Sequence, residues 1–468
     1  MQKRLVPKTL TFIAASLLLI LLGAAMPTKS SSSNVILVPR DYATIQQAID
    51  RANPGDTIEI ASGTYNEKLK ITKSIRLVGQ GINQTVVSDS GTVVTVDADN
   101  VEIRGLSVRD GTYGIFLWYC QNALLRDNEM SGNRWNFGVW GSSVSEFIHD
   151  IDSSNKVDGK TLYYWTNRRG GQVPKDAGYV ALVNSTEILM KDAMLTSNEQ
   201  GVLLVSTTNS IVENVTAYGN DVGIDSRWSS NNTIRKSRFA STVLHAVYFE
   251  DSHDNAFYEN TMLNNILGLE LVSCNRNAFY HNNFIENTDQ VWQAQTQQTS
   301  WQNEDAHAGN YWSDYTGPDA NGDGIGDTPY GIDSSNQDNY PLINIYAQEP
   351  PRAHAGEDKT VVKNSAEIFD ASESFDDVGI NQYSWDFGDG TTENGREVSH
   401  AYAEVGEYVV TLTVVDLAGK SSSSTLRVTV VEPPLALTWW IVVIGIAAGG
   451  ILFASLFFWK SRSTKKKK

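Results

Sequence analysis

The fold is decided by a short motif that recurs along the middle of the chain. The motif reads Asn232-Thr233-Ile234-Arg235-Lys236-Ser237, and variants follow as Asn255-Ala256-Phe257-Tyr258-Glu259-Asn260 and Asn277-Ala278-Phe279-Tyr280-His281-Asn282. The leading asparagines of these copies are 23 and 22 residues apart. A second column, Gly201, Gly223, Ala246 and Gly268, has gaps of 22, 23 and 22 residues. A fixed period in the range of about 20–50 residues is typical of repeat architectures.

Each period holds three short β-type segments separated by Gly, Asn and Asp. Such a unit cannot bury a face alone, whereas coils stacked about 4.8 Å apart can. Asparagine tolerates left-handed turns and can hydrogen-bond between stacked copies. We extend the leading asparagine column back to Asn209, and assign Asn214 to a further, inward-facing column. Propeller blades need about 40–50 residues and leucine-rich repeats need a leucine signature that is missing, so the sequence predicts a parallel β-helix.

The segments before the repeats resemble the first coils of a known superfamily. A short amphipathic helix is expected at Ala43–Ile49, followed by Pro54-Gly55-Asp56-Thr57-Ile58, Gly63-Thr64-Tyr65 and Ile75–Gly81. These motifs resemble pectin-lyase-like right-handed parallel β-helices. The later repeats resemble the NosD-like branch with carbohydrate-binding and sugar-hydrolase type repeats, in archaeal cell-surface proteins. The resemblance covers roughly residues 35–346 and implies an all-β fold.

A second domain is indicated at residues 350–432. It contains Trp385-Asp386-Phe387-Gly388-Asp389-Gly390, His400-Ala401-Tyr402 and a period-two strand pattern from Gly406 to Val414. These motifs resemble a polycystic-kidney-disease (PKD) domain, an immunoglobulin-like β-sandwich. The resemblance implies a spacer or interaction module without catalytic residues.

The two ends of the chain predict membrane targeting. Residues 1–26 have a basic start and an apolar run, as in a signal peptide or a signal anchor. Residues 435–459 form an uncharged run long enough for a transmembrane helix, and the Lys-rich segment 460–468 follows it. The positive-inside rule then places a basic tail in the cytoplasm and the ectodomain outside, on a single-pass cell-membrane protein.

The charge of the chain limits the kinds of molecule it is expected to bind, and its cysteine content limits the disulfides it can form. The formal net charge is −17 although the two ends are basic, so the body of the chain is strongly acidic and nucleic-acid binding is not expected. Only Cys120 and Cys274 are present, in the same predicted column but several coils apart, so we expect free thiols. The stretch from Asp150 to Asp192 is too long for one coil and is interpreted as a coil with a protruding loop.

One outward face of the predicted β-helix carries candidate ligand-binding residues. We align the coils on Gly114, Gly138, Gly201, Gly223, Ala246, Gly268 and Gln290, because the next position is apolar in every coil. Strand alternation sends the following position outward, at Phe116, Trp140, Leu203, Asp225, Tyr248, Glu270 and Trp292. Two residues further on lie Trp118, Val205, Arg227, Glu250 and Val272.

Aromatic rings can stack on sugar rings, and charged side chains can bond hydroxyl groups. We therefore predict ligand binding by Phe116, Trp118, Trp140, Arg227, Tyr248 and Trp292. The candidate catalytic residues are Asp225, Glu250 and Glu270. Two coils would separate Asp225 from Glu270 by about 9–10 Å, near the spacing at which paired carboxylates invert a glycosidic bond. Alternatively, Arg227 and Glu250 form only a surface ion pair.

An acidic loop near the end of the β-helix is a candidate calcium site. Oxygen ligands have calcium-like spacing at Asp319, Asn321, Asp323 and Asp327, with the backbone carbonyl of Ile325 between them. Tyr330 stands where an EF-hand has glutamate, so Asp333 or Asp338 would complete the shell. An unliganded turn is the alternative. Copper is not expected, because the seven histidines are dispersed.

Three classes of function fit these features. The first is a membrane-anchored cell-surface protein whose β-helix binds extracellular carbohydrate or mediates adhesion, with the PKD domain as spacer or interaction module. The second is a polysaccharide-active enzyme, namely a glycoside hydrolase, lyase or epimerase. The third is a structural protein of the cell envelope.

Overall fold

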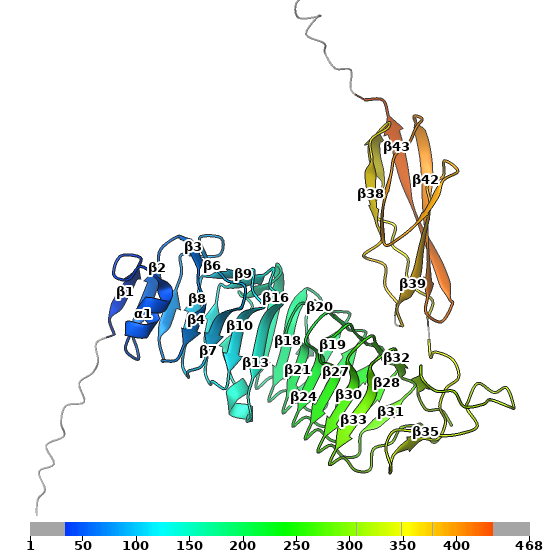
Figure 1. Ribbon diagram of the computed structural model, residues 1–468, viewed down its shortest axis with the longest axis horizontal. Helices are drawn as coiled ribbons and strands as arrows, with labels where there is room; N and C mark the ends of the chain where they lie inside the picture. Colours follow the sequence, from blue (N-terminus) through cyan, green and yellow to red (C-terminus); the bar gives the residue numbers. More distant parts are fainter. Residues whose placement is uncertain (1–32, 306, 348, 377, 434–468) are drawn as a thin grey trace, which may run out of the picture.

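The computed structural model describes residues 33–305, 307–347, 349–376 and 378–433 (Figure 1). The predicted signal segment, transmembrane run and basic tail lie outside these residues. Within the described ranges, no helix is both long and apolar enough to span a membrane.

Three parallel sheets form the walls of the first half of a β-helix. The first wall contains β1 (Val35–Val38), β2 (Thr57–Ile60), β5 (Arg76–Val78), β8 (Glu102–Arg104), β11 (Leu124–Arg126) and β14 (Asp150–Ile151). The second contains β3 (Gly63–Asn66), β6 (Thr85–Ser88), β9 (Ser107–Arg109), β12 (Glu129–Ser131) and β15 (Lys156–Val157). The third contains β4 (Leu69–Ile71), β7 (Thr92–Val96), β10 (Tyr113–Trp118) and β13 (Trp135–Trp140).

The predicted helix at the start of the β-helix is confirmed as α1 (Ile45–Arg51). The side chain of Thr44 caps it by accepting a hydrogen bond from the backbone N–H of Gln47. Ile45, Ala48 and Ile49 are buried against the first coils. The helix therefore covers apolar surface that the first coil would otherwise expose.

The chain reverses at Asp158 and Gly159, where the structure departs from the predicted protruding loop. Both residues have positive φ (47° and 77°), and Val157 pairs with Lys160 across an antiparallel hairpin. An Asp-Gly pair suits this two-residue turn. After the turn, an additional short coil follows rather than a loop, formed by β16 (Lys160–Thr166), β17 (Arg169–Gln172) and β18 (Ala177–Val183). The loop prediction is wrong, because every residue of β18 is buried.

The second half resumes the parallel ladder with three walls. Long strands continue from β16 and β18 as β21 (Gln200–Val205), β24 (Val222–Arg227), β27 (His245–Glu250), β30 (Leu267–Val272) and β33 (Asp289–Ala294). The second wall adds β19 (Thr186–Lys191), β22 (Ile211–Glu213), β25 (Thr233–Arg235), β28 (Ala256–Tyr258) and β31 (Ala278–Tyr280) to β17. The third contains β20 (Met194–Thr196), β23 (Thr216–Tyr218), β26 (Arg238–Ala240), β29 (Thr261–Leu263), β32 (Asn283–Ile285) and β34 (Tyr311–Trp312).

Two strands form a wall between the cores of the two halves. Tyr179, Ala181 and Val183 of β18 face the core of the first half, whereas Val180 and Leu182 face the core of the second. The same division holds in β21, where Leu203 and Val205 join the first core and Val202 and Leu204 join the second. Leu203 and Val205 were predicted to lie on an exposed face; both are fully buried, because the first half packs over them.

Asparagine ladders line the corners of the second half. In one ladder, the side-chain oxygens of Asn232, Asn255 and Asn277 accept the N–H groups of Ser210, Asn232 and Asn255, respectively. Parallel ladders run through Asn260 and Asn282 and through Asn265 and Asn287. Asn209 and Asn214 lie one residue before their ladders, with φ of 51° and 52°, so their assignment to the ladder columns is wrong by one position.

The C-terminal end of the β-helix is closed by an aspartate rather than an asparagine. Asn310 continues the ladder of Asn282, and Asp338 accepts hydrogen bonds from the backbone N–H of Asn310 and from the indole of Trp312. Asp338 belongs to β36 (Gln337–Asp338), which pairs with β35 (Tyr330–Gly331). The short hairpin therefore anchors the last coil.

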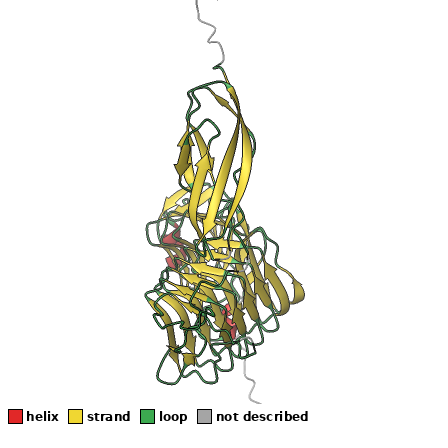
Figure 2. Ribbon diagram, turned by 90° about the vertical axis from the view of Figure 1, so that its right-hand side faces the viewer, coloured by secondary structure: helices red, strands yellow, loops and turns green. Residues whose placement is uncertain are grey.

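The predicted second domain is a two-sheet sandwich that projects from one side of the β-helix, next to the wall containing β20, β23 and β26 (Figure 2). One sheet contains β37 (Lys359–Val362), β43 (Ser421–Val431), β42 (Gly406–Asp416), β39 (Ile380–Asp386) and β40 (Thr392–Asn394). The other contains β38 (Glu367–Asp370) and β41 (Glu397–His400). Trp385, Phe387 and Tyr402 fill its core.

Both cysteines are free and buried, as predicted. Cys120 packs in the core of the first half and Cys274 in the core of the second. Burial raises the pKa of Cys120 to about 12 and that of Cys274 to about 11. The two thiols are therefore poor nucleophiles in the folded protein.

Candidate functional site

The predicted register of the outward column is confirmed over five consecutive coils of the second half. Leu203 pairs with Asp225, Asp225 with Tyr248, Tyr248 with Glu270, and Glu270 with Trp292. The neighbouring outward column passes through Val205, Arg227, Glu250, Val272 and Ala294. Aromatic and charged side chains therefore do share one face of this half.

The predicted register of the first half is wrong by two residues. The structure pairs Phe116 with Gly138 and Trp118 with Trp140, whereas the sequence alignment equated Gly114 with Gly138. Packing of aromatic side chains accounts for the observed register of β13. Tyr113 pairs with Trp135, and their rings lie 4.8 Å apart. Trp118 and Trp140 are thus neighbours, with ring centres 6.2 Å apart.

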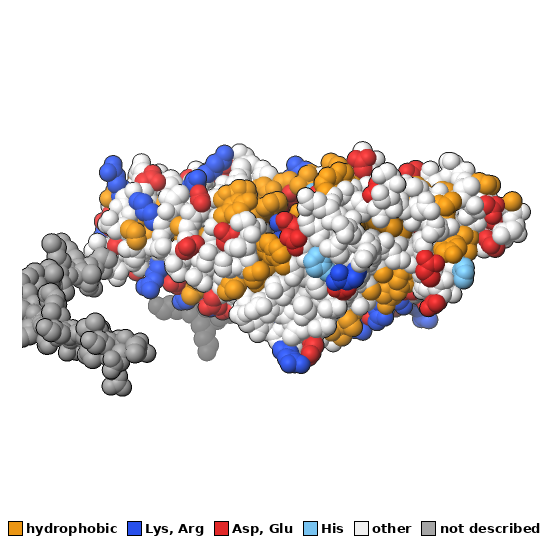
Figure 3. Space-filling view, turned by 90° about the horizontal axis from the view of Figure 1, so that it is seen from below, with side chains coloured by type: hydrophobic (Ala, Val, Ile, Leu, Met, Phe, Trp, Pro, Cys, Tyr) orange, Lys and Arg blue, Asp and Glu red, His pale blue; other side chains and the backbone are white. Residues whose placement is uncertain are grey.

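These rings form an aromatic shelf at the end of the first half, defined here as Phe116, Trp118, Tyr119 and Trp140. The rings of Phe116 and Trp118 lie 5.4 Å apart, and those of Trp118 and Tyr119 lie 4.9 Å apart. Trp118 is 39% exposed and Tyr119 is 43% exposed. Figure 3 shows hydrophobic side chains gathered on the middle of the β-helix, with acidic side chains beside them.

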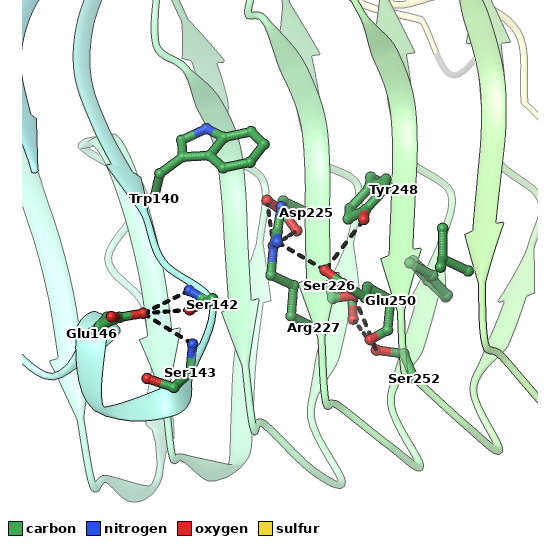
Figure 4. A network of polar contacts seen from close by, with 12 residues as sticks. Trp140, Ser142, Ser143, Glu146, Asp225, Ser226, Arg227, Tyr248, Glu250 and Ser252 are labelled. Atoms are coloured by element: carbon green, nitrogen blue, oxygen red, sulfur yellow. Dashed lines mark hydrogen bonds and ion pairs between the residues drawn. The ribbon is translucent and has the colours of Figure 1, made fainter. Parts of the chain in front are cut away.

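Arg227 is the centre of a buried ionic network next to the shelf (Figure 4). Its Nε atom donates to both carboxylate oxygens of Asp225, at 2.9 and 3.1 Å. Its Nη1 atom donates to Oε2 of Glu250 at 2.8 Å, and the hydroxyl of Tyr248 donates to the same oxygen. The guanidinium lies between the rings of Trp140 and Tyr248, about 5 Å from the centre of each.

The ionic network around Arg227 is largely buried, which affects the charge state of its members. The side chains of Arg227 and Asp225 are 8% and 3% exposed, and the Trp140 ring at the end of β13 lies 5.0 Å from the Arg227 guanidinium. Although burial disfavours the charge of Arg227, the carboxylates of Asp225 and Glu250 raise its pKa. Arg227 and Glu250 do form an ion pair, at 2.8 Å, but it is not the surface pair of the alternative interpretation, because the Arg227 side chain is only 8% exposed.

Glu199 is a buried acid that the sequence did not single out. The indole N–H of Trp140 donates to Oε1 of Glu199, while Oε2 has no hydrogen-bond partner among the described residues. Burial raises the pKa of Glu199 well above its usual range, and the nearby Asp225 and Asp221 act in the same direction. The shift favours the protonated form of Glu199. It precedes β21 directly, a position that carries no signal in the sequence.

A second acid–base group lies beside the network. His245 Nδ1 is 2.7 Å from Oε2 of Glu270, and the rings of His245 and Tyr248 are 5.5 Å apart. Burial raises the pKa of Asp221, and electrostatic interactions with His245 and Arg134 partly offset this rise. Of these residues, only Glu270 and Tyr248 were predicted from the sequence.

The three candidate catalytic carboxylates have different partners. Asp225 is held by Arg227, Glu250 by Arg227 and Tyr248, and Glu270 by His245. Tyr248 stands between Asp225 and Glu270 in the column. The carboxylates of Asp225 and Glu270 thus do not face each other across an open gap, as an inverting pair would.

The acidic loop forms a compact set of turns. Asp319 accepts hydrogen bonds from the N–H groups of Gly322, Asp323 and Gly324, and Asp327 accepts from Ala320. Asn321 donates to Asp323, and the backbone N–H of Ile325 also donates to Asp323.

The sequence suggests Asp333 or Asp338 as the residue that completes the ligand shell of this loop. Asp333 accepts from Ser335 and Asn336, and Asp338 ends the asparagine ladder. Both carboxylates are therefore engaged with residues outside the acidic loop.

Within the described ranges, no three His, Cys, Asp or Glu side chains are grouped so that they form a metal site by themselves, so a cation in the acidic loop would also need the amide oxygen of Asn321 and the backbone carbonyl of Ile325. A copper centre needs clustered histidine, methionine or cysteine. Both cysteines are buried in separate cores. The described residues do not offer a ligand set for copper.

Comparisons with known proteins identify two regions of the chain. The PKD domain family matches residues 348–430. Collagenase ColA of Clostridium perfringens is 33% identical over 111 residues, which are 24% of this chain and 10% of that protein. The chain thus spans a tenth of the length of this curated relative.

Two solved structures show partial similarity to the chain, one over its larger part and one over a short segment. The mannuronan C-5 epimerase AlgE4 A-module of Azotobacter vinelandii is 16% identical, with a TM-score of 0.29 over 55% of this chain and 76% of that one. A structure of carbohydrate-binding modules from the β-sandwich superfamily is 36% identical, with a TM-score of 0.17 over 18% of this chain and 35% of that one.

The family described as "Periplasmic copper-binding protein (NosD)" matches residues 49–168 and 139–317. These two ranges overlap and together span more than half of the chain. They cover stacked coils of both halves and the three charged residues of the ionic network, Asp225, Arg227 and Glu250. The chain belongs to the NosD family of parallel β-helix proteins, and carries a PKD domain after the β-helix.

Proposed function

We propose that this protein binds extracellular carbohydrate on the face formed by the aromatic shelf and the strands β24, β27, β30 and β33. The observation that carries the proposal is the placement of exposed rings beside a pre-ordered polar network. Trp118 at one end and Trp292 at the other are 39% and 49% exposed, with Tyr248, Glu250 and Glu270 between them. Aromatic faces suit the apolar faces of sugar rings, and carboxylate oxygens accept from sugar hydroxyl groups.

The fixed geometry of the ionic network around Arg227 supports a ligand-binding role for this face. The buried Arg227 bonds Glu250 and lies beside the Tyr248 ring, so these partly exposed side chains are held in place before any ligand arrives and would lose little side-chain entropy on binding. The face also follows the axis of the stacked coils, which suits an extended polymer.

A glycan array with the full-length protein tests this function. We expect glycan hits, and we expect the variants Trp118→Ala and Trp292→Ala each to weaken binding of those hits at least fivefold. Tyr280→Ala is the matched control, because Tyr280 stacks on Tyr258 on a different wall of the β-helix. Undiminished binding by both tryptophan variants would refute this face, and an array without hits would favour a structural envelope role.

A second candidate is catalysis on a polysaccharide at the same face. The observation that favours it is the contact between His245 and Glu270 beside the phenol of Tyr248. A carboxylate can orient a histidine as a general base, as hydrolysis, elimination or epimerisation requires. Assays for new reducing ends and unsaturated products on array hits test it. Activity that persists in His245→Gln would rule out this assignment.

We further propose that the two domains are displayed outside the cell on a C-terminal membrane anchor. The proposal is supported by the apolar run 435–459 and the basic residues after it. Truncation after Glu432 should release a folded protein into the medium, because β43 ends at Val431. Retention of the truncated protein in the membrane would instead make residues 1–26 an uncleaved anchor.

A further inference from the structure

A cleft of about 710 Å³ lies between the β-helix and the PKD domain, away from the aromatic shelf. The β-helix contributes Met194, Tyr218 and Arg238 from the outer surface of β20, β23 and β26. The PKD domain contributes Arg352, Tyr383 and Arg396. Small-ligand sites occupy roughly 300–1,000 Å³ and are often found between domains.

The two walls of the cleft are held together by a docked linker. Asn283 of β32 exchanges two hydrogen bonds with the backbone of Tyr346, at 2.8 Å each. The Tyr346 ring stacks on His281, with ring centres 4.3 Å apart. Leu417 of the PKD domain packs with Ala240 and its neighbours on the same wall of the β-helix. The cleft is therefore defined by specific contacts between the domains.

Three of the residues that line the cleft are arginines, and other charged residues in the lining have ionic partners nearby. Lys175 pairs with Asp192 at 2.8 Å, and His354 lies 3.4 Å from Glu373. Arg238, Arg352 and Arg396 remain, and Asp376 is the acid close to them. The lining holds four Lys or Arg and three Asp or Glu residues, so the cleft has a slight excess of positive charge in a protein whose formal net charge is −17.

Arg238 is the innermost of these arginines. It is half-buried, and its Nε atom has no hydrogen-bond partner in the described part of the chain. Burial lowers the pKa of Arg238. Gly379 of the PKD domain has φ of 110°, and a Cβ atom there would lie 3.1 Å from this Nε. The glycine thus lets the backbone approach the arginine closely.

The rest of the cleft combines polar residues, such as Asn214, Thr216 and Ser374, with apolar and aromatic side chains. Met194 and Tyr218 are each 45% exposed, and Tyr383 is half-buried on the opposite wall. Arginine matches planar or tetrahedral oxyanions with its fork of donors, and tyrosine rings can cover a sugar ring. An inorganic ion alone would fill little of this volume.

We propose that the cleft between the two domains binds an acidic saccharide, with its oxyanion on Arg238 and Arg352 and its ring between Tyr218 and Tyr383. This site is separate from the aromatic shelf and does not depend on the function proposed for that face. It also differs in charge, since carboxylates predominate on the shelf side.

Calorimetric titration of the full-length protein with a uronic-acid trisaccharide tests the site. We expect binding that is at least tenfold tighter than that of a neutral glucose trisaccharide or of sodium sulfate. Arg238→Gln should weaken it at least tenfold, and Arg352→Gln, at an exposed position that folding tolerates, at least threefold. Arg276→Gln is the matched control, because its exposed side chain pairs with Asp254 elsewhere.

Several outcomes would overturn the proposal. They are the absence of binding, equal affinity for the neutral trisaccharide, equal affinity for sulfate, or unchanged affinity in both arginine variants. Sulfate binding alone would indicate a bare-anion site rather than a saccharide site. Trp118→Ala should leave uronate binding unchanged, so failure here and failure at the aromatic shelf are distinguishable.

Discussion

The guanidinium of Arg227 lies 5.0 Å from the centre of the Trp140 ring, although Trp140 ends β13 and Arg227 ends β24. This contact joins the two halves of the β-helix where the chain has reversed. It places an aromatic side chain from the first half over a charged strand of the second. The carbohydrate-binding face we propose is thus built from both halves, and its polar centre is sealed from water.

The first prediction concerns the strength of this sealed network. Arg227→Met should lower the free energy of unfolding by about 3–5 kcal/mol, because it leaves the Asp225 carboxylate buried without its partner. Arg276→Met is the control, since its exposed pair with Asp254 should contribute about 1 kcal/mol or less. Urea denaturation followed by circular dichroism measures both. Equal losses in the two variants would contradict the sealed arrangement.

The second prediction concerns the pH dependence set by Glu199. Burial raises the pKa of Glu199 in the fold, whereas the unfolded chain ionises above about pH 4.3. The folded state then binds one more proton, so stability falls as pH rises above 4.3, by up to about 1.4 kcal/mol per unit, until the folded carboxyl ionises. Glu199→Gln keeps an acceptor for the Trp140 indole and removes this loss.

The stability of Glu199→Gln relative to the wild type should therefore increase as pH rises above 4.3. Chemical denaturation at several pH values between 4 and 8 checks this. A constant difference between the two proteins would show that Glu199 is ionised in the fold.

The β-helix and the outward face of its second half could be predicted from the sequence. Two patterns agree there, the alternation of apolar residues along each strand and the repeat spacing between coils. Val202, Ile224 and Val247 alternate with outward residues, and the 22- or 23-residue spacing aligns them coil by coil. In the first half, Gly138 was aligned with Gly114. Hydrogen bonding instead aligns Trp135 with Tyr113, because the large aromatic side chains pack together across the ladder.

The site itself was only partly predictable, because it depends on a reversal of the chain. Asp158-Gly159 is readable as a tight turn, but no local signal shows that the next strands will pack against the first half. That packing buries Asp225 and Glu199 and covers Leu203. Burial of an outward strand face is a tertiary event, and strand alternation alone does not reveal it.

The third prediction tests the ladders that align the coils. Asn260 accepts from Ser237 and donates to the carbonyl of Ile234 and to Asn282, all within the buried corner. Asn260→Ala should lower the free energy of unfolding by about 2–5 kcal/mol, because buried polar groups lose their partners. Asn66→Ala, at an exposed position on β3, should change it by about 0.5 kcal/mol or less. Similar values for both would contradict a stabilising ladder.

The fourth prediction concerns calcium, which we propose as a structural ion of the loop containing Asp319, Asn321, Asp323, Ile325 and Asp327. If it binds, millimolar calcium should raise the melting temperature relative to chelator, since a ligand that binds only the folded state stabilises it. Asp319→Asn combined with Asp323→Asn should abolish the shift, and Asp50→Asn on α1 should not. The absence of a shift in the wild type would make the loop an unliganded set of turns.

The last prediction concerns His149, which is buried beside Tyr164 and accepts a hydrogen bond from the backbone N–H of Ala123. Burial lowers the pKa of His149 to about 4, so the imidazole stays neutral in the fold. The unfolded chain binds a proton below about pH 6.5. Its contribution to stability is complete above that pH, and is lost as pH falls toward 4, at up to about 1.4 kcal/mol per unit. His149→Gln retains an acceptor for Ala123 but cannot titrate, so its deficit relative to the wild type should be largest at pH 7.5 and should shrink by pH 4.5. Denaturation curves at these two pH values measure the deficit, and an equal deficit at both would mean that His149 is already protonated in the fold.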